Sequence, residues 1–303
     1  MKVAALVVTY NRLDLLKECI DALVNQKKDV SHIIVIDNNS NDGTREYLSG
    51  IHDEKFVIKS LNENLGGSGG FFEGISIFQK ELNDDYIWIM DDDTIPTPSA
   101  LNELEIAARN VDSFGFLASN VRWTDGTPSS VNIPAVNDSK WNLTVNSEND
   151  NFYPVLEHAS FVSIIVPKNV INEVGMPIKE FFIWGDDVEY TTRISEKYLS
   201  YYVPHSLVIH KIKNNNSMSI VNENGDRVDR YFYDVRNKMY RARELSHKKG
   251  IKMRIRILMD FFKVLFKPNV KKRFRKLWII LKGVCCGIFF RPKIVYIKSE
   301  DRM

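Results

Sequence analysis

Two groups of carboxylates are the clearest candidates for chemistry in this 303-residue chain. The first is Asp91-Asp92-Asp93, which follows an apolar run at residues 86–90. If that run is a strand, alternate side chains share one side, so Asp91 and Asp93 converge while Asp92 points away. Such oxygen ligands suit Mg²⁺ or Mn²⁺, which bridge substrate phosphates. An acidic turn that caps the next helix is the structural alternative, but three adjacent carboxylates repel one another, which favours a cation.

The second group lies in the motif Trp184-Gly185-Asp186-Asp187-Val188-Glu189-Tyr190. Asp186 precedes Glu189 by three residues, which is the spacing of a capping box and predicts Asp186 as a helix N-cap. Asp187 would then lie in the first turn, where the helix dipole favours its ionised form and where it could take a proton from an acceptor hydroxyl. Both residues could instead be caps only. Asp187 is the better candidate for a base, and Asp186 stays open.

A glycine-rich segment, Asn64-Leu65-Gly66-Gly67-Ser68-Gly69-Gly70, separates a predicted strand from a predicted helix. Glycines let backbone N–H groups approach a diphosphate, and a helix N-terminus opposes its charge. The segment lacks the Gly-Lys-Ser/Thr ending of the Walker pattern. Flexible glycine loops are common, so its position one strand before the carboxylate triplet is what favours a phosphate-binding role.

Two single residues are further candidates. Asp37 closes an apolar run at residues 33–37, where a carboxylate can accept hydrogen bonds from a nucleoside, although capping of the following turn is the alternative. His210 follows the apolar residues 207–209, and an imidazole is an acceptable third Mn²⁺ ligand beside two carboxylates. A lone histidine at a strand end is also often structural, so the residues alone leave both roles open.

The elements that must position these residues alternate between short runs rich in Val and Ile and helical patterns. The predicted strands are residues 3–8, 33–37, 56–59, 86–90 and 161–167, and the predicted helices are residues 13–24, 70–82, 99–109, 226–247, 251–266 and 271–290, with one more that starts near Asp186. This order indicates an α/β fold with a mainly parallel sheet covered on both faces. Ligands bind beyond the carboxyl ends of such strands, where the polar motifs lie.

Composition and charge narrow the setting. The chain is 44% hydrophobic, which is typical of a globular protein. Three cysteines form no paired framework, which favours a reducing cytosol, and the first apolar run is too short for a signal peptide. Residues 1–237 hold 21 Lys and Arg against 35 Asp and Glu, whereas residues 238–303 hold 20 against 4. The two parts therefore face different partners.

Taken in order, the motifs resemble family 2 glycosyltransferases of the GT-A fold, over about residues 3–240, and most closely their galactofuranosyltransferase and rhamnosyltransferase branch. The motifs are Val7-Val8-Thr9-Tyr10-Asn11-Arg12, Asp37, Asn64 to Phe71, Asp91-Asp92-Asp93, Trp184 to Tyr190 and His210. The resemblance implies a nucleotide-diphospho-sugar transferase domain at residues 1–240, with a mostly parallel sheet flanked by helices. A basic, amphipathic helical extension at residues 241–303 would follow it.

The resemblance also implies a role for each site residue. Nucleotide-sugar binding falls on Thr9, Arg12, Asp37, Asn64, Gly66, Gly67 and Asp92; Mn²⁺ or Mg²⁺ binding on Asp91, Asp93 and His210; catalysis on Asp187 or Asp186; and acceptor packing on Trp184. The implied reaction is inverting transfer of galactofuranose from UDP-galactofuranose to a glycan, with rhamnosyl or hexopyranosyl transfer as the alternative. Galactofuranan polymerases carry large additional domains, whereas only about 65 residues follow the core here, which favours addition of one or a few sugars.

The basic end of the chain predicts a membrane partner. Apolar residues recur at helical spacing at positions 274, 277, 278, 281, 285 and 288 beside five Lys and Arg at 271–276. The apolar run 277–290 contains Lys282 and falls short of the ~20 residues that span a bilayer, so a helix lying on the surface fits better. We expect a cytoplasmic protein, peripheral on the anionic inner face of the cell membrane, acting on a lipid-linked acceptor. A helical bundle or a homo-oligomer interface is the alternative.

Other functions fit less well. Nucleic acid is a poor partner because the first 237 residues are acidic and the basic end lacks a recognised nucleic-acid motif. A sugar nucleotidyltransferase would release pyrophosphate, but the chain shows no basic triphosphate-binding signature near its start. A non-catalytic sugar-nucleotide-binding partner would be favoured by loss of the acidic pairs, and both pairs are present.

Overall fold

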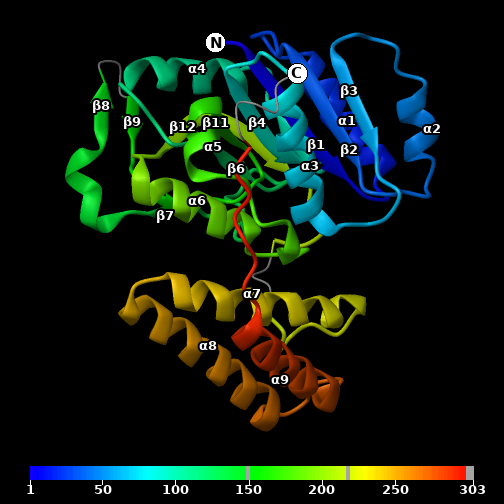
Figure 1. Ribbon diagram of the computed structural model, residues 1–303, viewed down its shortest axis with the longest axis vertical. Coiled ribbons are helices and arrows are strands. Elements are labelled where there is room, and N and C mark those ends of the chain that lie inside the picture. The colour runs from blue at the N-terminus through cyan, green and yellow to red at the C-terminus, as the bar shows by residue number, and fades with distance from the viewer. Residues whose placement is uncertain (148–150, 216–218, 298–303) are drawn as a thin grey trace.

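The computed structural model describes residues 1–147, 151–215 and 219–297. An α/β unit built on an eight-stranded sheet makes up most of the chain, and a three-helix unit lies beneath it (Figure 1). The strand order is β3-β2-β1-β4-β11-β6-β12-β5.

The first four strands of the chain are parallel neighbours, as their continuous apolar character predicts. They are β1 (Val3–Thr9), β2 (His32–Asp37), β3 (Phe56–Ser60) and β4 (Tyr86–Asp91), and the helices among and after them are α1 (Leu13–Val24), α2 (Thr44–Ser49), α3 (Gly66–Glu81) and α4 (Ala100–Asn110). Every residue of β1 is buried, because α1 and α4 cover one face of the sheet and α3 covers the other.

The second half of the sheet mixes directions. β11 (Ile164–Pro167) runs antiparallel to both β4 and β6 (Leu117–Arg122), and β12 (Tyr201–His210) runs parallel to β6. The short β5 (Thr94–Pro96) pairs antiparallel with β12, which aligns His210 with Thr94. The sheet is therefore mostly parallel, as expected, and the strand predicted at 161–167 begins at Ile164.

Smaller elements complete the α/β unit. They are β7 (Ala135–Val136), β8 (Val145–Ser147), β9 (Asn151–Tyr153), β10 (Leu156–His158), α5 (Lys168–Val174), α6 (Asp186–Lys197) and 3-10 turns at Asp138–Leu143, Lys179–Phe181 and Asp226–Arg230. The helix α6 packs on the same face of the sheet as α3 through Tyr190 and Ile194.

The helices α7 (Tyr231–Glu244), α8 (His247–Phe266) and α9 (Arg273–Phe289) form the three-helix unit around a core of their own. Val235 of α7 packs closely on Gly283 of α9. A Cβ at position 283 would lie 2.8 Å from the Val235 side chain, so the close approach of the two helices requires a glycine there. The domain boundary expected after residue 240 falls inside α7. We propose that the boundary between the α/β unit and the three-helix unit lies before that helix. Among the described residues, no helix has both the length and the apolar character needed to cross a bilayer.

The chain does not end on the three-helix unit. Residues 290–297 run back along the α/β unit, where the Met176 N–H donates to the Val295 carbonyl at 2.8 Å and Ile297 packs against the core (Figure 1). The extension predicted at 241–303 is therefore attached at both ends, and its last six residues, 298–303, lie outside the described residues.

Candidate active site

The strands that carry the motifs end at one edge of the sheet. Thr9 pairs with Asp37 across β1 and β2, and Val8 pairs with Asp91 across β1 and β4. The edge lies on the side of the α/β unit that faces the three-helix unit (Figure 1). The parallel strands therefore place the polar residues predicted from the sequence at the same edge of the sheet.

Asp91, Asp93 and His210 form a group whose ligand atoms all lie within 4.8 Å of one another. The β5–β12 pairing brings His210 close to Asp93. The Lys211 N–H donates a hydrogen bond to the Asp93 carbonyl at 2.8 Å, which fixes this end of β12 beside Asp93. Asp92 lies outside this group, but not through the alternation expected of an extended chain: β4 ends at Asp91, and Asp92 and Asp93 lie in a turn, where both contact Arg12.

The hydrogen bonds of His210 leave room for a cation. Its Nδ1 lies 2.7 Å from Oδ1 of Asn132, an amide oxygen that can only accept, so Nδ1 carries the proton. In a neutral ring Nε2 then presents a lone pair to Oδ1 of Asp93, 3.0 Å away. Two acceptors at that distance need a proton or a metal ion between them. The three residues therefore fit Mn²⁺ or Mg²⁺, and Asn132 orients the imidazole ligand.

The electrostatics of the triplet agree with a cation. Burial, together with the charges of Asp93 and Asp92, raises the pKa of Asp91 well above its usual range. Burial also raises the pKa of Asp92 to about 6, although Arg12 opposes the rise. Burial acts in the same direction on Asp93, but without a metal ion a protonated His210 would donate to it, and this hydrogen bond, the imidazolium charge and the charge of Arg12 together lower the pKa of Asp93.

Thr9 and Arg12, which were expected at the nucleotide together with Asp92, both contact Asp92. Asp92 accepts from the Thr9 hydroxyl at 2.7 Å and from the Arg12 guanidinium at 3.0 Å. The same guanidinium nitrogen lies 2.6 Å from Asp93. Arg12, about half exposed, thus supplies the positive charge that the carboxylates attract.

Asp37 has one engaged oxygen and one free oxygen. Oδ1 accepts from the Ser40 N–H at 2.9 Å, which is the turn-capping role named above as the alternative. Oδ2 is buried without a hydrogen-bond partner, and its nearest cation, Nε of Arg45, is 3.7 Å away. A buried carboxylate oxygen without a donor costs free energy, and a ligand hydroxyl at this edge would satisfy it.

The segment expected to be a glycine loop is largely helical, because α3 already begins at Gly66. Gly66 has φ +73°, and a Cβ there would lie 2.0 Å from the Phe182 carbonyl oxygen, so this glycine makes room for another chain segment. A Cβ on Gly67 would meet nothing within 4 Å, so the backbone of Gly67 is open to a ligand. Asn64 accepts from the Gly66 N–H at 2.8 Å and from Asn38 at 3.0 Å, and so fixes the start of α3.

The second acidic cluster begins α6, but not as a capping box. Gly185 is the N-cap, with φ +87°, and no side chain caps the helix. Glu189 pairs with Arg193 at 2.9 Å and does not reach back toward Asp186. The capping prediction for Asp186 is wrong because a left-handed glycine, not a side chain, turns the chain into the helix.

The two aspartates have different surroundings. Asp186 is buried, and burial together with the charge of Asp187 raises its pKa to about 7. Burial also raises the pKa of the half-buried Asp187, while the Val188 N–H and the charge of Arg241 oppose the rise. The charge of Asp187 also raises the pKa of Asp91, as the smallest of several causes, so the two acidic clusters lie within electrostatic range of each other.

Two residues of α7 complete the site, and the sequence motifs did not reveal them. The buried Asn237 amide donates to the carbonyls of Phe181, Ile183 and Trp184 at 3.0, 3.1 and 2.9 Å. Arg241 lies against Gly185 and faces Asp187. Both act across a long stretch of chain, so no local pattern predicts them. Asn38, which follows β2 directly, could have been found from its position.

Trp184 lies where the α/β unit meets the three-helix unit. It is half-buried, and its ring packs edge-to-face on Tyr231 with centroids 5.1 Å apart. Trp184 and Phe182 both have φ +65°, an unfavourable conformation for residues with a Cβ. The hydrogen bonds from Asn237 therefore hold a strained loop directly before the two aspartates.

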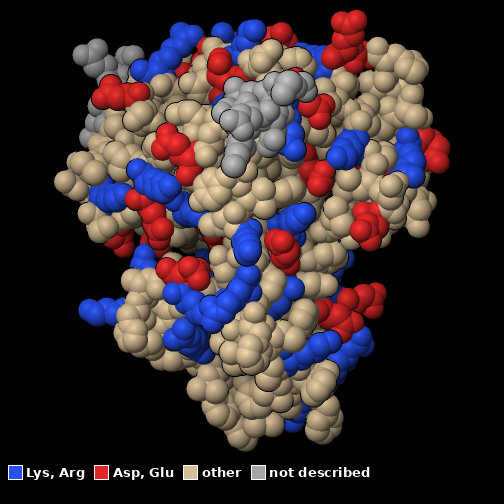
Figure 2. Space-filling view, viewed as in Figure 1, with Lys and Arg blue, Asp and Glu red and all other residues tan. Residues whose placement is uncertain are grey.

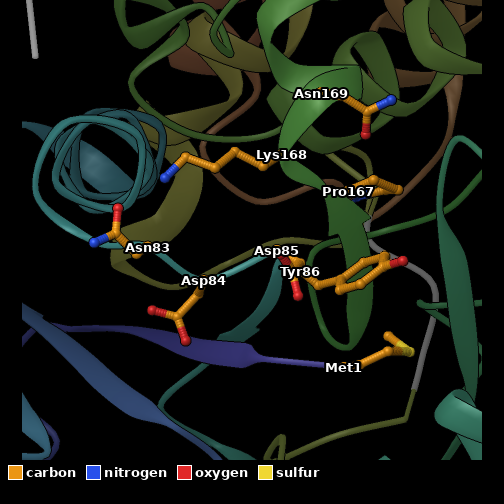
Figure 3. A pocket seen from close by; sticks show the side chains of 8 residues that line it. All are labelled: Met1, Asn83, Asp84, Asp85, Tyr86, Pro167, Lys168 and Asn169. Atoms are coloured by element: carbon orange, nitrogen blue, oxygen red, sulfur yellow. The ribbon is translucent and has the colours of Figure 1, made fainter.

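A hollow of about 520 Å³ lies at the opposite end of the strands (Figure 3). Its lining residues are Met1, Asn83, Asp84, Asp85, Tyr86, Pro167, Lys168 and Asn169. Tyr86 begins β4 and Pro167 ends the antiparallel β11, so the hollow faces away from the carboxylates. It contains none of the predicted site residues, and we assign no chemistry to it.

Known proteins share this sequence pattern and fold. Residues 4–127 match the family described as Glycosyl transferase family 2. The galactofuranosyltransferase GlfT1 of Mycolicibacterium smegmatis is 28% identical over 199 residues, which cover 63% of this chain and 65% of the relative's own length. The chain thus aligns with slightly less than two thirds of that relative.

Two solved structures show the same architecture. One is GalNAc-T7 with UDP, GalNAc and Mn²⁺, which has a TM-score of 0.59 at 12% identity over 93% of this chain and 55% of that one. The other is S. aureus TarS 1–349, which has a TM-score of 0.59 at 14% identity over 94% of this chain and 81% of that one. The sequence match and the relative thus make this chain similar to family 2 glycosyltransferases, and among them to galactofuranosyltransferases, and the two structures share its fold.

Proposed function

We propose that the protein is an inverting, metal-dependent glycosyltransferase that transfers galactofuranose from UDP-galactofuranose to a glycan. The observation that carries the proposal is the group that Asp91, Asp93 and His210 form at the sheet edge where β1, β2 and β4 end. The donor is inferred from the GlfT1 relative, and the nucleotide from the UDP in the GalNAc-T7 structure. Rhamnosyl or hexopyranosyl transfer is the alternative within the family.

In this reaction an acceptor hydroxyl loses its proton to Asp187, and the oxygen attacks the anomeric carbon of the donor. The bond from that carbon to the diphosphate breaks, the nucleoside diphosphate leaves, and the configuration inverts. Asp187 is preferred to Asp186 because it is the more exposed of the two and the charge of Arg241 favours its ionised form. Asp186 is buried beside Ser68.

Asp91, Asp93 and His210 would hold Mn²⁺ or Mg²⁺, and the bound ion would neutralise charge on the leaving diphosphate. Arg12, which now contacts Asp93, would then be released toward the phosphates. Arg12 would keep its hydrogen bond to Asp92, which Thr9 in turn contacts.

The remaining donor and acceptor contacts follow from position. The free oxygen of Asp37 would accept from the nucleoside, and the open backbone of Gly67, fixed by Gly66 and Asn64, would face the diphosphate. Trp184 would pack against the acceptor sugar.

The test is a donor screen followed by two substitutions. Purified protein with Mn²⁺ is offered UDP-galactofuranose, dTDP-rhamnose and UDP-glucose, and sugar transfer and free nucleoside diphosphate are measured. Asp187→Asn should bind the donor normally and lose about 10²–10⁴-fold in transfer, the usual contribution of a general base. Asp93→Asn should weaken Mn²⁺ binding in calorimetry. Transfer by Asp187→Asn at the unmutated rate would show that the base is assigned wrongly, and release of pyrophosphate would indicate a nucleotidyltransferase.

We also propose a lipid-linked acceptor in bacterial surface polysaccharide synthesis and a place on the inner face of the cell membrane. The basic three-helix unit supports this setting. A homo-oligomer stays a prediction.

A further inference from the structure

The helix α8 has two apolar faces. Its inner face contributes Ile257 and Val264 to the core of the three-helix unit. Its outer face carries large apolar side chains that are 40–73% exposed: Ile251, Ile255, Leu258, Met259, Phe262 and Phe266. At about 100° per residue these six share an arc of about 100°, centred roughly 150° from the buried pair. Packing within the described chain accounts for the inner face only.

The helix α9 repeats this arrangement. Ile279, Ile280 and the close-packed Gly283 and Gly287 point into the unit. The opposite side exposes Phe274, Trp278, Leu281, Ile288 and Phe289, with Phe274 at 86% and Phe289 at 82%. Leu277, which the helical spacing placed on this outer face, is instead half-buried against the core of the unit. We call the two outer faces, from Ile251 to Phe266 and from Phe274 to Phe289, the apolar ridge.

Positive charge surrounds the apolar ridge. Residues 247–289 contain thirteen Lys and Arg, of which Lys276 is buried and donates to the Val221 carbonyl, and a single acid, Asp260. Figure 2 shows Lys and Arg across the upper part of the three-helix unit, while its far end is largely free of charged atoms. An apolar end beneath a layer of cations matches the depth profile of a bilayer with anionic headgroups.

Other occupants match this surface less well. A second copy of the chain would bring two strongly cationic surfaces together, which costs free energy. Nucleic acid would satisfy the Lys and Arg but would leave Phe266, Phe274 and Trp278 in water. Because no described helix can cross a bilayer, a membrane partner implies that the helices lie in the interface.

We propose that the apolar ridge docks the protein on an anionic phospholipid surface, with α8 and α9 lying in the interface. This inference deepens the proposed function. It rests on that function only for the lipid-linked nature of the acceptor. Trp184 packs on Tyr231 of α7, and α7 packs on α9, so docking places the acceptor side of the active site above the membrane.

The test measures vesicle binding without any sugar transfer. Full-length protein is mixed with vesicles of phosphatidylcholine alone or with equal phosphatidylglycerol, and flotation and Trp fluorescence are recorded. We expect binding to the anionic vesicles, a blue shift on binding, and weaker binding at high salt. The quadruple variant Phe262→Ser, Phe266→Ser, Phe274→Ser and Trp278→Ser should bind at least about tenfold more weakly, because each change removes interfacial apolar area.

The matched control is Ile133→Ser, which removes a side chain that is 69% exposed on the α/β unit and should leave binding unchanged. Circular dichroism checks that each variant is folded. The proposal is overturned if the native protein ignores anionic vesicles, if the quadruple variant binds as well as the native protein, or if the ridge variant instead abolishes a dimer seen in sedimentation. Transfer to a soluble acceptor should survive in the quadruple variant, so a failure of docking is distinguishable from a failure of the enzymatic assignment.

Discussion

Replacement of Asn237 by Ala is expected to separate activity from stability. The two N–H bonds of the Asn237 amide are shared among three carbonyls in the loop before Asp186, one buried and two partly buried, and that loop holds Phe182 and Trp184 at φ +65°. The substitution removes the amide from all three carbonyls, and only the Phe181 carbonyl keeps another side-chain donor, the Arg236 guanidinium at 3.1 Å. The question is whether the loop then keeps its shape.

The magnitudes indicate that it does not. A buried carbonyl without a donor costs about 1–3 kcal/mol. Each left-handed residue with a Cβ stores about 1–3 kcal/mol of strain, which the loop recovers if it relaxes. Because these free energies are of similar size, relaxation should keep the loss of global stability below about 2 kcal/mol, only a part of the hydrogen-bond cost. Asp187 would leave its position, and transfer should fall by about 10²-fold, as expected for a displaced catalytic group.

The assay compares kcat, the Kd for the nucleotide and the free energy of unfolding in urea. Nucleotide affinity should change less than kcat, because Asp37 lies on β2, although the loop contacts the start of α3 where the Ser68 N–H donates to the Phe182 carbonyl at 3.2 Å. The matched control is Gln79→Ala, since the buried Gln79 amide donates to the Lys168 carbonyl at 3.1 Å, far from the carboxylates. That variant should lose about 1 kcal/mol of stability with kcat unchanged. A kcat for Asn237→Ala within about threefold of native would refute the positioning role.

Two further predictions follow from close contacts and burial. Gly66→Ala should destabilise the protein strongly in urea unfolding, because its Cβ would overlap the Phe182 carbonyl. Gly67→Ala should leave stability unchanged and raise KM for the donor, because its Cβ meets no protein atom. Equal stability of the two variants would contradict this reasoning. Burial, aided by the charge of Arg241, lowers the pKa of His158 to about 4. The unfolded chain therefore takes up this proton as pH falls through about 6.5 while the native state does not, so stability present at pH 7.5 should drop by about 1 kcal/mol at pH 5.5. His158→Gln should remove that part of the pH dependence, and an unchanged pH slope of the unfolding free energy would count against it.

The sheet and the position of the candidate metal ligands at its edge could be predicted from the sequence because both depend on local patterns. Continuous Val and Ile runs mark buried parallel strands, and the residue after each run must lie at the ligand-binding edge. Asp91 and Asp93 are therefore predictable from their strand alone. His210 reaches them through the short β5, which no periodicity marks, so its role needed the resemblance as well.

Other features could not be read because they depend on contacts between distant segments. The glycine segment is helical, and Gly70 is needed there because a Cβ would lie 2.4 Å from the Val8 side chain. In the sequence this packing requirement looks like loop flexibility. Asp186 matched a capping box, but Gly185 made the cap unnecessary. Asn237 and Arg241 belong to a helix whose place beside the active site is set by tertiary packing.

The return of residues 290–297 to the α/β unit affects how far the enzyme can reach. A three-helix unit joined to the rest of the chain at one end could swing, but one that the chain both enters and leaves on the same side is restrained in tilt and height. If the apolar ridge rests in lipid, the carboxylates would stay at a nearly constant elevation above the headgroups. Acceptors whose reactive sugar protrudes to that elevation would be favoured, and a series of lipid-linked glycans of increasing length should show an optimum.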